Sequence, residues 1–113
     1  MAERRKPVVI DVLVPAYNEE STILDLLRSV RKQKVAGFKF NIIVVDDGSR
    51  DSTPELLAEN SDLYDVMVRQ DNGGKGSAVI AGLKAAEGDY ILFQDADLEY
   101  DPNEYADLVM PIA

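Results

Sequence analysis

The sequence contains no cysteine and no histidine among its 113 residues. The absence of cysteine excludes a disulfide framework and a thiolate zinc site. The absence of histidine removes the side chain that most often serves as a general base or a metal ligand near neutral pH. Any acid–base or metal chemistry must therefore rest on carboxylates, lysine or tyrosine.

Long apolar runs and an excess of positive charge are also missing. No stretch reaches the roughly 20 apolar residues of a membrane-spanning helix, and residues 1–7 lack the apolar centre of a signal peptide. The formal net charge of −9 argues against nucleic-acid binding, which depends on neutralising phosphates with lysine and arginine. We therefore expect a cytoplasmic chain whose residues 1–7, with Arg4, Arg5 and Lys6, form a solvated basic tail.

The chain does contain an alternation of apolar runs and helical patterns. Nearly continuous apolar runs predict strands buried on both faces, at residues 8–14, 41–45, 64–69 and 89–94. Apolar spacing and helix-start signals predict helices that begin near residues 21, 52, 76 and 101. Ser52 and Glu55 form a capping-box pattern, Asp101 is a cap for the last helix, and Gly88 is the expected stop of the third.

Strands that alternate with helices in this way favour an α/β fold with right-handed crossovers. We expect one domain with an open, mostly parallel sheet of about four strands flanked by helices, since 113 residues suffice for one core and not for two. In such sheets ligands bind beyond the carboxyl ends of the strands. The unusual polar residues of this sequence fall at those ends.

The most informative polar cluster is Asp95-Ala96-Asp97, directly after the fourth predicted strand. Residues i and i+2 of an extended segment point the same way, so Asp95 and Asp97 can face one point, with Glu99 on the same parity. Oxygen-rich clusters suit Mg2+ or Mn2+, which shares its coordination shell with substrate phosphates. The alternative is a solvated turn, since such charges normally lie at the surface.

Three further polar segments fall at the same edge, at residues 15–20, 46–49 and 72–76. Each has a structural alternative, because Asn and Glu cap helices and Asp and Gly form turns. A carboxylate at a strand end can instead accept hydrogen bonds from a base or a ribose, and Tyr17 can lie flat beside a nucleobase. The glycines around Lys75 would let backbone N–H groups approach a phosphate, although the segment has neither Walker A nor G-x-G-x-x-G spacing.

Together these motifs resemble family 2 glycosyltransferases of the GT-A fold. The resemblance covers about Val8 to Pro111 and implies a Rossmann-like GT-A half-domain. The pairing of Gly-Lys-Gly with Asp-Ala-Asp is most similar to the dolichyl-phosphate mannose synthase branch and its bacterial polyprenyl-phosphate sugar transferase relatives. The motifs that carry the resemblance are Val14-Pro15-Ala16-Tyr17-Asn18-Glu19, Val45-Asp46-Asp47-Gly48-Ser49 with Asp51 and Thr53, Asn72-x-Gly74-Lys75-Gly76, and Asp95-Ala96-Asp97.

The resemblance implies a role for each matching residue. The nucleotide pocket would be lined by Pro15, Ala16, Tyr17 and Glu19. The base and ribose would be contacted by Val45 and Asp47, with Asp46 supporting them, and Lys75 would lie near the donor or brace its loop. The sugar-diphosphate would meet Asp95, Ala96 and Asp97, and a Mg2+ or Mn2+ ion would be held by Asp97 together with Asp95 and Glu99.

The resemblance also implies a reaction, the inverting transfer of a hexose from a GDP- or UDP-sugar to a polyprenyl phosphate or a hydroxyl. Family members continue into an acceptor-binding half that holds the general base where one is needed. We therefore expect residues 8–113 to be the nucleotide-sugar-binding part alone, with its catalytic base unidentified and turnover by the chain on its own doubtful. In a full-length context it would work at the cytoplasmic face of a membrane.

The sequence leaves two hypotheses open besides a glycosyltransferase. The first is a catalytically silent nucleotide-binding or assembly module built on the same fold. The second is a nucleotidyltransferase, against which the absence of an early glycine-rich basic loop after the first strand argues. An exposed fourth strand would in addition favour a homo-oligomer through the sheet edge.

Overall fold

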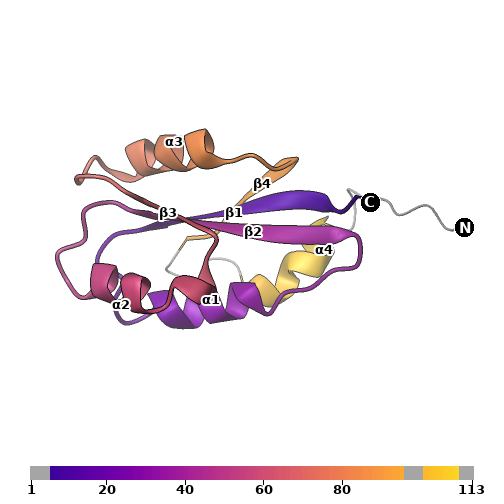
Figure 1. Cartoon of the computed structure of the whole chain (residues 1–113), viewed down its shortest axis with the longest axis horizontal. Helices are drawn as coiled ribbons and strands as arrows, with labels where there is room; N and C mark the ends of the chain where they lie inside the picture. The colour runs from indigo at the N-terminus through magenta and orange to yellow at the C-terminus, as the bar shows by residue number, and fades with distance from the viewer. Residues whose placement is uncertain (1–5, 96–100, 110–113) are drawn as a thin grey trace, which may run out of the picture.

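Four parallel strands and four helices make up the computed structural model, which describes residues 6–95 and 101–109 (Figure 1). The predicted α/β architecture is confirmed. The strands are β1 (Val8–Ala16), β2 (Phe38–Asp46), β3 (Val66–Arg69) and β4 (Tyr90–Phe93). The helices are α1 (Ile23–Arg31), α2 (Thr53–Glu59), α3 (Lys75–Ala85) and α4 (Tyr105–Val109), with 3-10 turns at Ser61–Leu63 and Pro102–Glu104.

The strand order is β3-β2-β1-β4, and every pairing is parallel. The two central strands align along their whole length, from Val8 opposite Phe38 to Ala16 opposite Asp46. Arg69 at the end of β3 also lies opposite Asp46. The carboxyl ends of these three strands therefore lie level, and they form one edge of the sheet.

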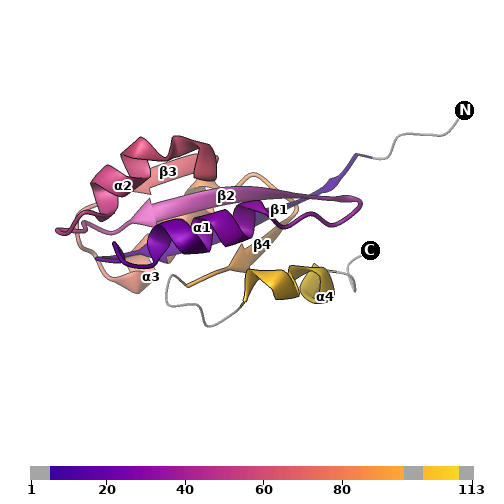
Figure 2. The ribbon, with the colours of Figure 1, turned by 90° about the horizontal axis from the view of Figure 1, so that it is seen from below.

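The two faces of the sheet are covered unequally. Helices α1, α2 and α4 lie on one face and α3 lies on the other (Figures 1 and 2). Because side chains alternate along a strand, Val12 and Val14 pack in the core under α1, whereas Leu13 lies against Gly82 of α3. The larger core cluster contains Val12, Val14, Ala16, Ile23, Leu26, Leu27, Val30, Ile42, Val44, Leu57, Leu63 and Tyr105.

Asp11 is a fully buried charged residue within β1, and it fixes the entry to β4. Its carboxylate accepts hydrogen bonds from Asn41 Nδ2 at 2.8 Å and from Gly88 N at 2.6 Å. A Cβ atom on Gly88 would lie 2.7 Å from Asp11 Oδ2. The prediction that Gly88 stops the third helix is therefore wrong, since α3 ends at Ala85 and Gly88 serves this close approach.

Of the two predicted N-terminal caps, the one at Ser52 is wrong and the one at Asp101 is confirmed. Ser52 precedes α2 but its side chain makes no capping hydrogen bond. The first N–H group of α2 is instead satisfied by Asp51, the residue before the N-cap, whose Oδ1 accepts from Thr53 N at 2.8 Å. The capping-box prediction is therefore wrong. The predicted cap at Asp101 is confirmed, since its Oδ1 accepts from Asn103 N at 2.9 Å.

Strand β4 is an edge strand of the sheet formed by the described residues. Its side chains Tyr90, Ile91 and Phe93 are 37–48% exposed. An apolar unpaired edge favours association, and self-association through it stays a prediction. Across residues 6–95 and 101–109, no helix combines the length and the apolar character needed to cross a membrane.

Candidate functional site

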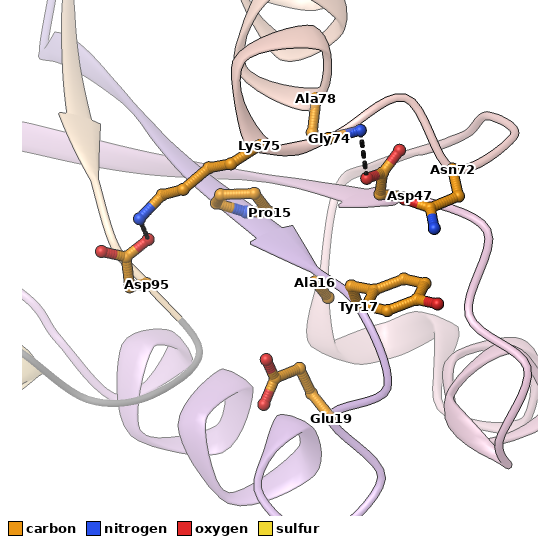
Figure 3. Close-up of a pocket in the computed structure, with 10 residues that line it drawn as sticks. All are labelled: Pro15, Ala16, Tyr17, Glu19, Asp47, Asn72, Gly74, Lys75, Ala78 and Asp95. Carbon is orange, nitrogen blue, oxygen red and sulfur yellow. Dashed lines mark hydrogen bonds and ion pairs between the residues drawn. The ribbon is translucent and has the colours of Figure 1, made fainter.

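A pocket of about 290 Å³ lies at the carboxyl edge of the sheet (Figure 3). From β1 the chain builds outward through β2 to β3, and then returns to place β4 on the other side of β1. Such a reversal of strand order opens a crevice between the connections that leave the strands, where ligands of open α/β sheets bind. The pocket is lined by Pro15, Ala16, Tyr17, Glu19, Asp47, Asn72, Gly74, Lys75, Ala78 and Asp95.

The end of β1 supplies one wall of the pocket. Ala16 is buried, and Tyr17 next to it is 39% exposed, so its ring presents a flat apolar surface to the pocket. Asn18 follows with a φ of 52°, in the left-handed region that only Asn, Asp and Gly tolerate readily. This turn directs Glu19 back into the pocket lining.

Hydrogen bonds between side chains and backbone connect the β1–α1 loop to the β2–α2 loop. Asn18 Oδ1 accepts from Arg50 N at 2.8 Å, and Asn18 N donates to Ser49 Oγ at 2.9 Å. Glu19 N donates to Thr53 Oγ1, also at 2.9 Å. These motif residues therefore hold two loops together, and this is the physical reason why Asn18, Ser49 and Thr53 occur at these positions.

Asp51 and Glu20 extend the same connection by a reciprocal pair. Glu20 N donates to Asp51 Oδ2 at 3.2 Å, and Ser52 N donates to Glu20 Oε2 at 3.0 Å. Burial of the Asp51 carboxyl acts to raise its pKa, but hydrogen bonds from the Thr53 hydroxyl and from backbone N–H groups outweigh it, so the pKa lies below its ordinary value. Asp51 is thus a stable carboxylate that orders the loop and lies outside the pocket lining.

Asp47 anchors the glycine-rich loop that precedes α3. Its Oδ1 accepts from Gln70 Nε2 at 2.8 Å and from Gly73 N at 2.9 Å, and its Oδ2 accepts from Gly74 N at 3.0 Å (Figure 3). Burial acts to raise the pKa of this carboxyl, but these three hydrogen bonds outweigh it and lower the pKa below its ordinary value. Asp47 is therefore held as a carboxylate with most of its acceptor capacity already used.

Two predicted site residues do not line the pocket. Val45 is fully buried and packs with Ile43 and Ala78 beneath α3. Asp46 is also fully buried; its Oδ1 accepts from Ser49 N at 3.0 Å, and its Oδ2 lies 3.2 Å from Arg69 Nη1. Neither residue lines the pocket, and the full burial of Val45 leaves its side chain without access to a ligand there. The supporting role expected of Asp46 stays a prediction.

Lys75 and Asp95 form an ion pair across the pocket. Lys75 Nζ lies 2.8 Å from Asp95 Oδ1 (Figure 3), with the lysine side chain 68% exposed and the aspartate 22% exposed. Asp95 is positioned by its neighbour Gln94, whose N donates to Leu13 O and whose Oε1 accepts from the hydroxyl of Tyr105 at 2.8 Å. Gln94 and Tyr105 are both fully buried, and burial raises the pKa of Tyr105, so this support stays protonated and neutral.

Of the three predicted metal ligands, the structure describes only Asp95. Ala96, Asp97 and Glu99 lie outside the described residues. Within residues 6–95 and 101–109 there is no cluster of three or more acidic residues that would hold a metal ion by itself. A Mg2+ or Mn2+ ion needs only one or two carboxylates when substrate phosphates complete its shell, and Asp95, which faces the pocket beside a cation, fits that requirement.

The structure adds three lining residues that the sequence did not assign. Asn72 and Gly74 belong to the loop recognised from its glycines, without a role of their own. Ala78 is a buried residue in the first turns of α3, and it leaves room for the pocket because its side chain is small. A helix-start pattern alone gives no signal that distinguishes Ala78 from any other alanine of α3.

Comparison with known proteins gives the site a context. Residues 11–113 match the family model described as glycosyl transferase family 2. An undecaprenyl-phosphate 4-deoxy-4-formamido-L-arabinose transferase of Proteus mirabilis is 35% identical over 105 residues, which are 88% of this chain and 32% of that protein. The chain thus spans about a third of the length of the curated relatives that it matches.

Solved structures agree with the sequence match. Glucosyl-3-phosphoglycerate synthase from Mycobacterium tuberculosis, in complex with Mn2+, UDP and glucosyl-3-phosphoglycerate, superposes with a TM-score of 0.75 at 31% identity, over 93% of this chain and 39% of that one. A mannosyltransferase from Pyrobaculum calidifontis, in complex with GDP-mannose and Mn2+, gives a TM-score of 0.70 at 30% identity, over 82% of this chain and 28% of that one. The described part of the chain therefore has the GT-A-like fold.

Proposed function

The chain belongs to glycosyltransferase family 2, and from that premise we propose that its pocket binds a nucleoside-diphosphate sugar together with a divalent metal ion. The observation that carries the proposal is the pocket at the sheet reversal. There an aromatic ring, acidic side chains and a glycine-rich helix start with a lysine come together from four separate connections. The solved structures that contain UDP or GDP-mannose with Mn2+ support it.

The nucleoside would bind at the end of the pocket formed by Tyr17, Asn72 and Asp47. The Tyr17 ring offers a stacking surface for a base. Since Asp47 already accepts three hydrogen bonds, it can accept at most about one more from a base or ribose. Its larger contribution would be to hold Asn72 and the glycine loop in place.

The diphosphate would bind between the start of α3 and the end of β4. Gly74 precedes the first residue of an 11-residue helix, whose N-terminal N–H groups favour an anion, and Lys75 adds a positive charge there. The metal would be held by Asp95 together with Asp97 and Glu99 of the acidic cluster. When bound, a divalent cation neutralises the charge of the leaving nucleoside diphosphate.

The reaction would be an inverting hexosyl transfer, with residues 8–113 as its donor-binding part. An acceptor oxygen attacks the anomeric carbon from the face opposite the diphosphate, and the bond to the diphosphate breaks. A polyprenyl phosphate supplies an oxygen that is already anionic near neutral pH, because the second pKa of a phosphate monoester is about 6. This acceptor therefore needs no general base, whereas a hydroxyl acceptor does, and the named activity of the Proteus mirabilis relative supports the lipid phosphate.

Calorimetric titration with UDP and with GDP, each with and without Mn2+, tests the proposal. Metal-dependent binding of one nucleotide is expected, and it identifies the base. Sugar transfer to undecaprenyl phosphate by this chain would exclude a silent nucleotide-binding module, whereas binding without transfer agrees with both a donor-binding part alone and a silent module. A lack of binding to both nucleotides would refute the proposal for this chain.

A further inference from the structure

The residue before Asp95 takes part in a fully buried pair of polar side chains. Gln94 and Tyr105 are each 0% exposed, and neither of them lines the pocket. The Tyr105 hydroxyl donates to Gln94 Oε1 at 2.8 Å. Two apolar side chains of the same shape can replace such a pair with little change in stability, because they carry no polar group that must be desolvated. Packing alone therefore does not account for a glutamine and a tyrosine at these positions.

Gln94 holds the main chain at Asp95. Its N donates to Leu13 O at 2.9 Å, which continues the pairing of β1 with β4 beyond the end of β4. Its side-chain Nε2 donates to Asp95 O at 3.3 Å. The main chain is therefore held just before Asp95 by β1, and at the Asp95 carbonyl by the Gln94 amide.

Tyr105 in turn holds the Gln94 amide, from the other end of the acidic segment. It is the first residue of α4 and follows Gln94 by 11 positions. Its ring packs against Phe40 of β2, with the ring centroids 5.5 Å apart, and belongs to the larger core cluster. The turn before α4 is tied to the chain just after α1, since Gln33 Nε2 donates to Asn103 Oδ1 at 3.0 Å. The Tyr105 hydroxyl is thus a donor whose position is fixed by the core.

We propose that Gln94 and Tyr105 are positioning residues, whose hydrogen bond sets the affinity of the pocket for its metal ion through Asp95. The proposal rests on the proposed function, because it concerns the metal ion that would accompany the nucleotide. Groups that orient a metal ligand raise metal affinity without touching the metal. A carboxylate on a fixed main chain also loses less conformational freedom when it coordinates an ion. The core contact of Tyr105 is in this way transmitted to the carboxylate that faces the pocket beside Lys75.

Two variants separate positioning from stability. Tyr105→Phe keeps the ring in the core and removes only the hydroxyl that orients Gln94. The double variant Gln94→Met with Tyr105→Phe replaces both polar groups by apolar groups of similar size, so its stability in urea should return toward that of the wild type. In both variants Asp95 keeps its side chain but loses the support that we assign to the pair.

The measurement is calorimetric titration of UDP and GDP at a series of Mn2+ concentrations. For both variants we expect the Mn2+ concentration at half-maximal nucleotide binding to rise about tenfold, the lower end of the range for groups that orient a metal ligand. Saturating Mn2+ should restore the nucleotide affinity of the wild type, because the groups that contact the nucleotide are unchanged. General damage to the fold would instead weaken nucleotide binding at every Mn2+ concentration.

Tyr64→Phe is the matched control. Its hydroxyl donates to Leu57 O at 2.9 Å, and Tyr64 is a partly buried tyrosine that does not line the pocket. The control therefore also removes one tyrosine hydrogen bond, and its Mn2+ requirement should equal that of the wild type.

Three results would overturn the inference while leaving the proposed function intact. These are a wild-type Mn2+ requirement in Tyr105→Phe, an equal rise in Tyr64→Phe, and weaker nucleotide binding by the folded variants that saturating Mn2+ does not restore. If the double variant does not fold, the single variant decides by the same criterion. Failure of the wild type to bind either nucleotide would overturn the proposed function, and the inference with it.

Discussion

Lys75 Nζ and Asp95 Oδ1 lie 2.8 Å apart, although one residue begins α3 and the other follows β4. The pair spans the crevice at the reversal of the strand order, where β2 and β3 lie on one side of β1 and β4 lies on the other. It places a cation and a carboxylate where a diphosphate and its metal ion would each need a partner of opposite charge. Ligand binding at this point would therefore exchange one ion pair for two.

Replacing Lys75 by Met should weaken nucleotide binding. The variant removes the cation that we place beside the diphosphate while keeping an unbranched apolar side chain. We expect roughly a tenfold rise in Kd for UDP or GDP, equal to about 1.4 kcal/mol, measured by calorimetry. Lys84→Met, in the last turn of the same helix, is the matched control and should leave Kd unchanged. Equal affinities for Lys75→Met and the wild type would remove Lys75 from the donor site.

Replacing Asp97 by Ala should abolish the metal dependence of nucleotide binding. This residue is assigned from the sequence motif, and Asp95 is its neighbour in the described part of the site. We expect Mn2+ to give no gain in affinity for the variant, in the same titration. Asp107→Ala, at an exposed position of α4, is the control. An unchanged response to Mn2+ would contradict the metal role of the acidic cluster.

Replacing Asp47 by Asn should destabilise the fold in a pH-dependent way. The Asn side chain has one acceptor oxygen where the carboxylate has two, so it cannot accept all three hydrogen bonds from Gln70, Gly73 and Gly74. We therefore expect a loss of about 1–3 kcal/mol in the free energy of unfolding at pH 7. Because the folded-state pKa of Asp47 is lowered from 3.8, its stabilisation is fully present above that value and is lost as the pH falls through the folded-state pKa.

Urea unfolding of both proteins from pH 7 downward measures this effect. The difference between the wild type and Asp47→Asn should be constant above about pH 5 and should shrink below pH 3.8. Asp71→Asn is the control on the same loop, since Asp71 is exposed. A difference that grows as the pH falls would show that the sign of the linkage is wrong.

Gly48→Ala should be more harmful than Gly37→Ala, although both glycines have a positive φ. The left-handed conformation costs a residue with a Cβ about 1–2 kcal/mol in either case. At Gly37 the new Cβ meets nothing within 4 Å, whereas at Gly48 it would lie 2.7 Å from Asn72 N. We therefore expect a larger drop in unfolding free energy for Gly48→Ala, together with weaker nucleotide binding because the Asn72 loop must move. Equal costs at the two positions would show that the backbone conformation accounts for the whole effect.

The sequence predicted the architecture because each strand is a local apolar run and each crossover has a local helix pattern. It also predicted which edge would carry the site, since polar residues follow β1, β2 and β4 directly. The position of Gly88 could not be predicted, because the feature that requires a glycine there is Asp11, a residue 77 positions earlier in the chain.

The sequence also could not predict which motif residues line the pocket and which ones hold the loops together. Asn18 and Ser49 belong to different motifs 31 residues apart, and only the folded chain shows that one donates to the other. Side chains that bind a ligand and side chains that hold a loop are of the same polar types, so composition does not separate them. Val45 is another residue whose role the sequence could not predict. It lies at a strand end near the pocket, but α3 covers it and buries its side chain.

The most direct test of the metal-assisted donor site is the titration of UDP and GDP with Mn2+, made in parallel on the wild type and on Asp95→Asn. We expect one nucleotide to bind the wild type only with Mn2+, and Asp95→Asn to lose most of the metal-dependent gain. Binding of neither nucleotide, or equal metal-dependent binding by the two proteins, would contradict the assignment of this pocket as a metal-assisted donor site.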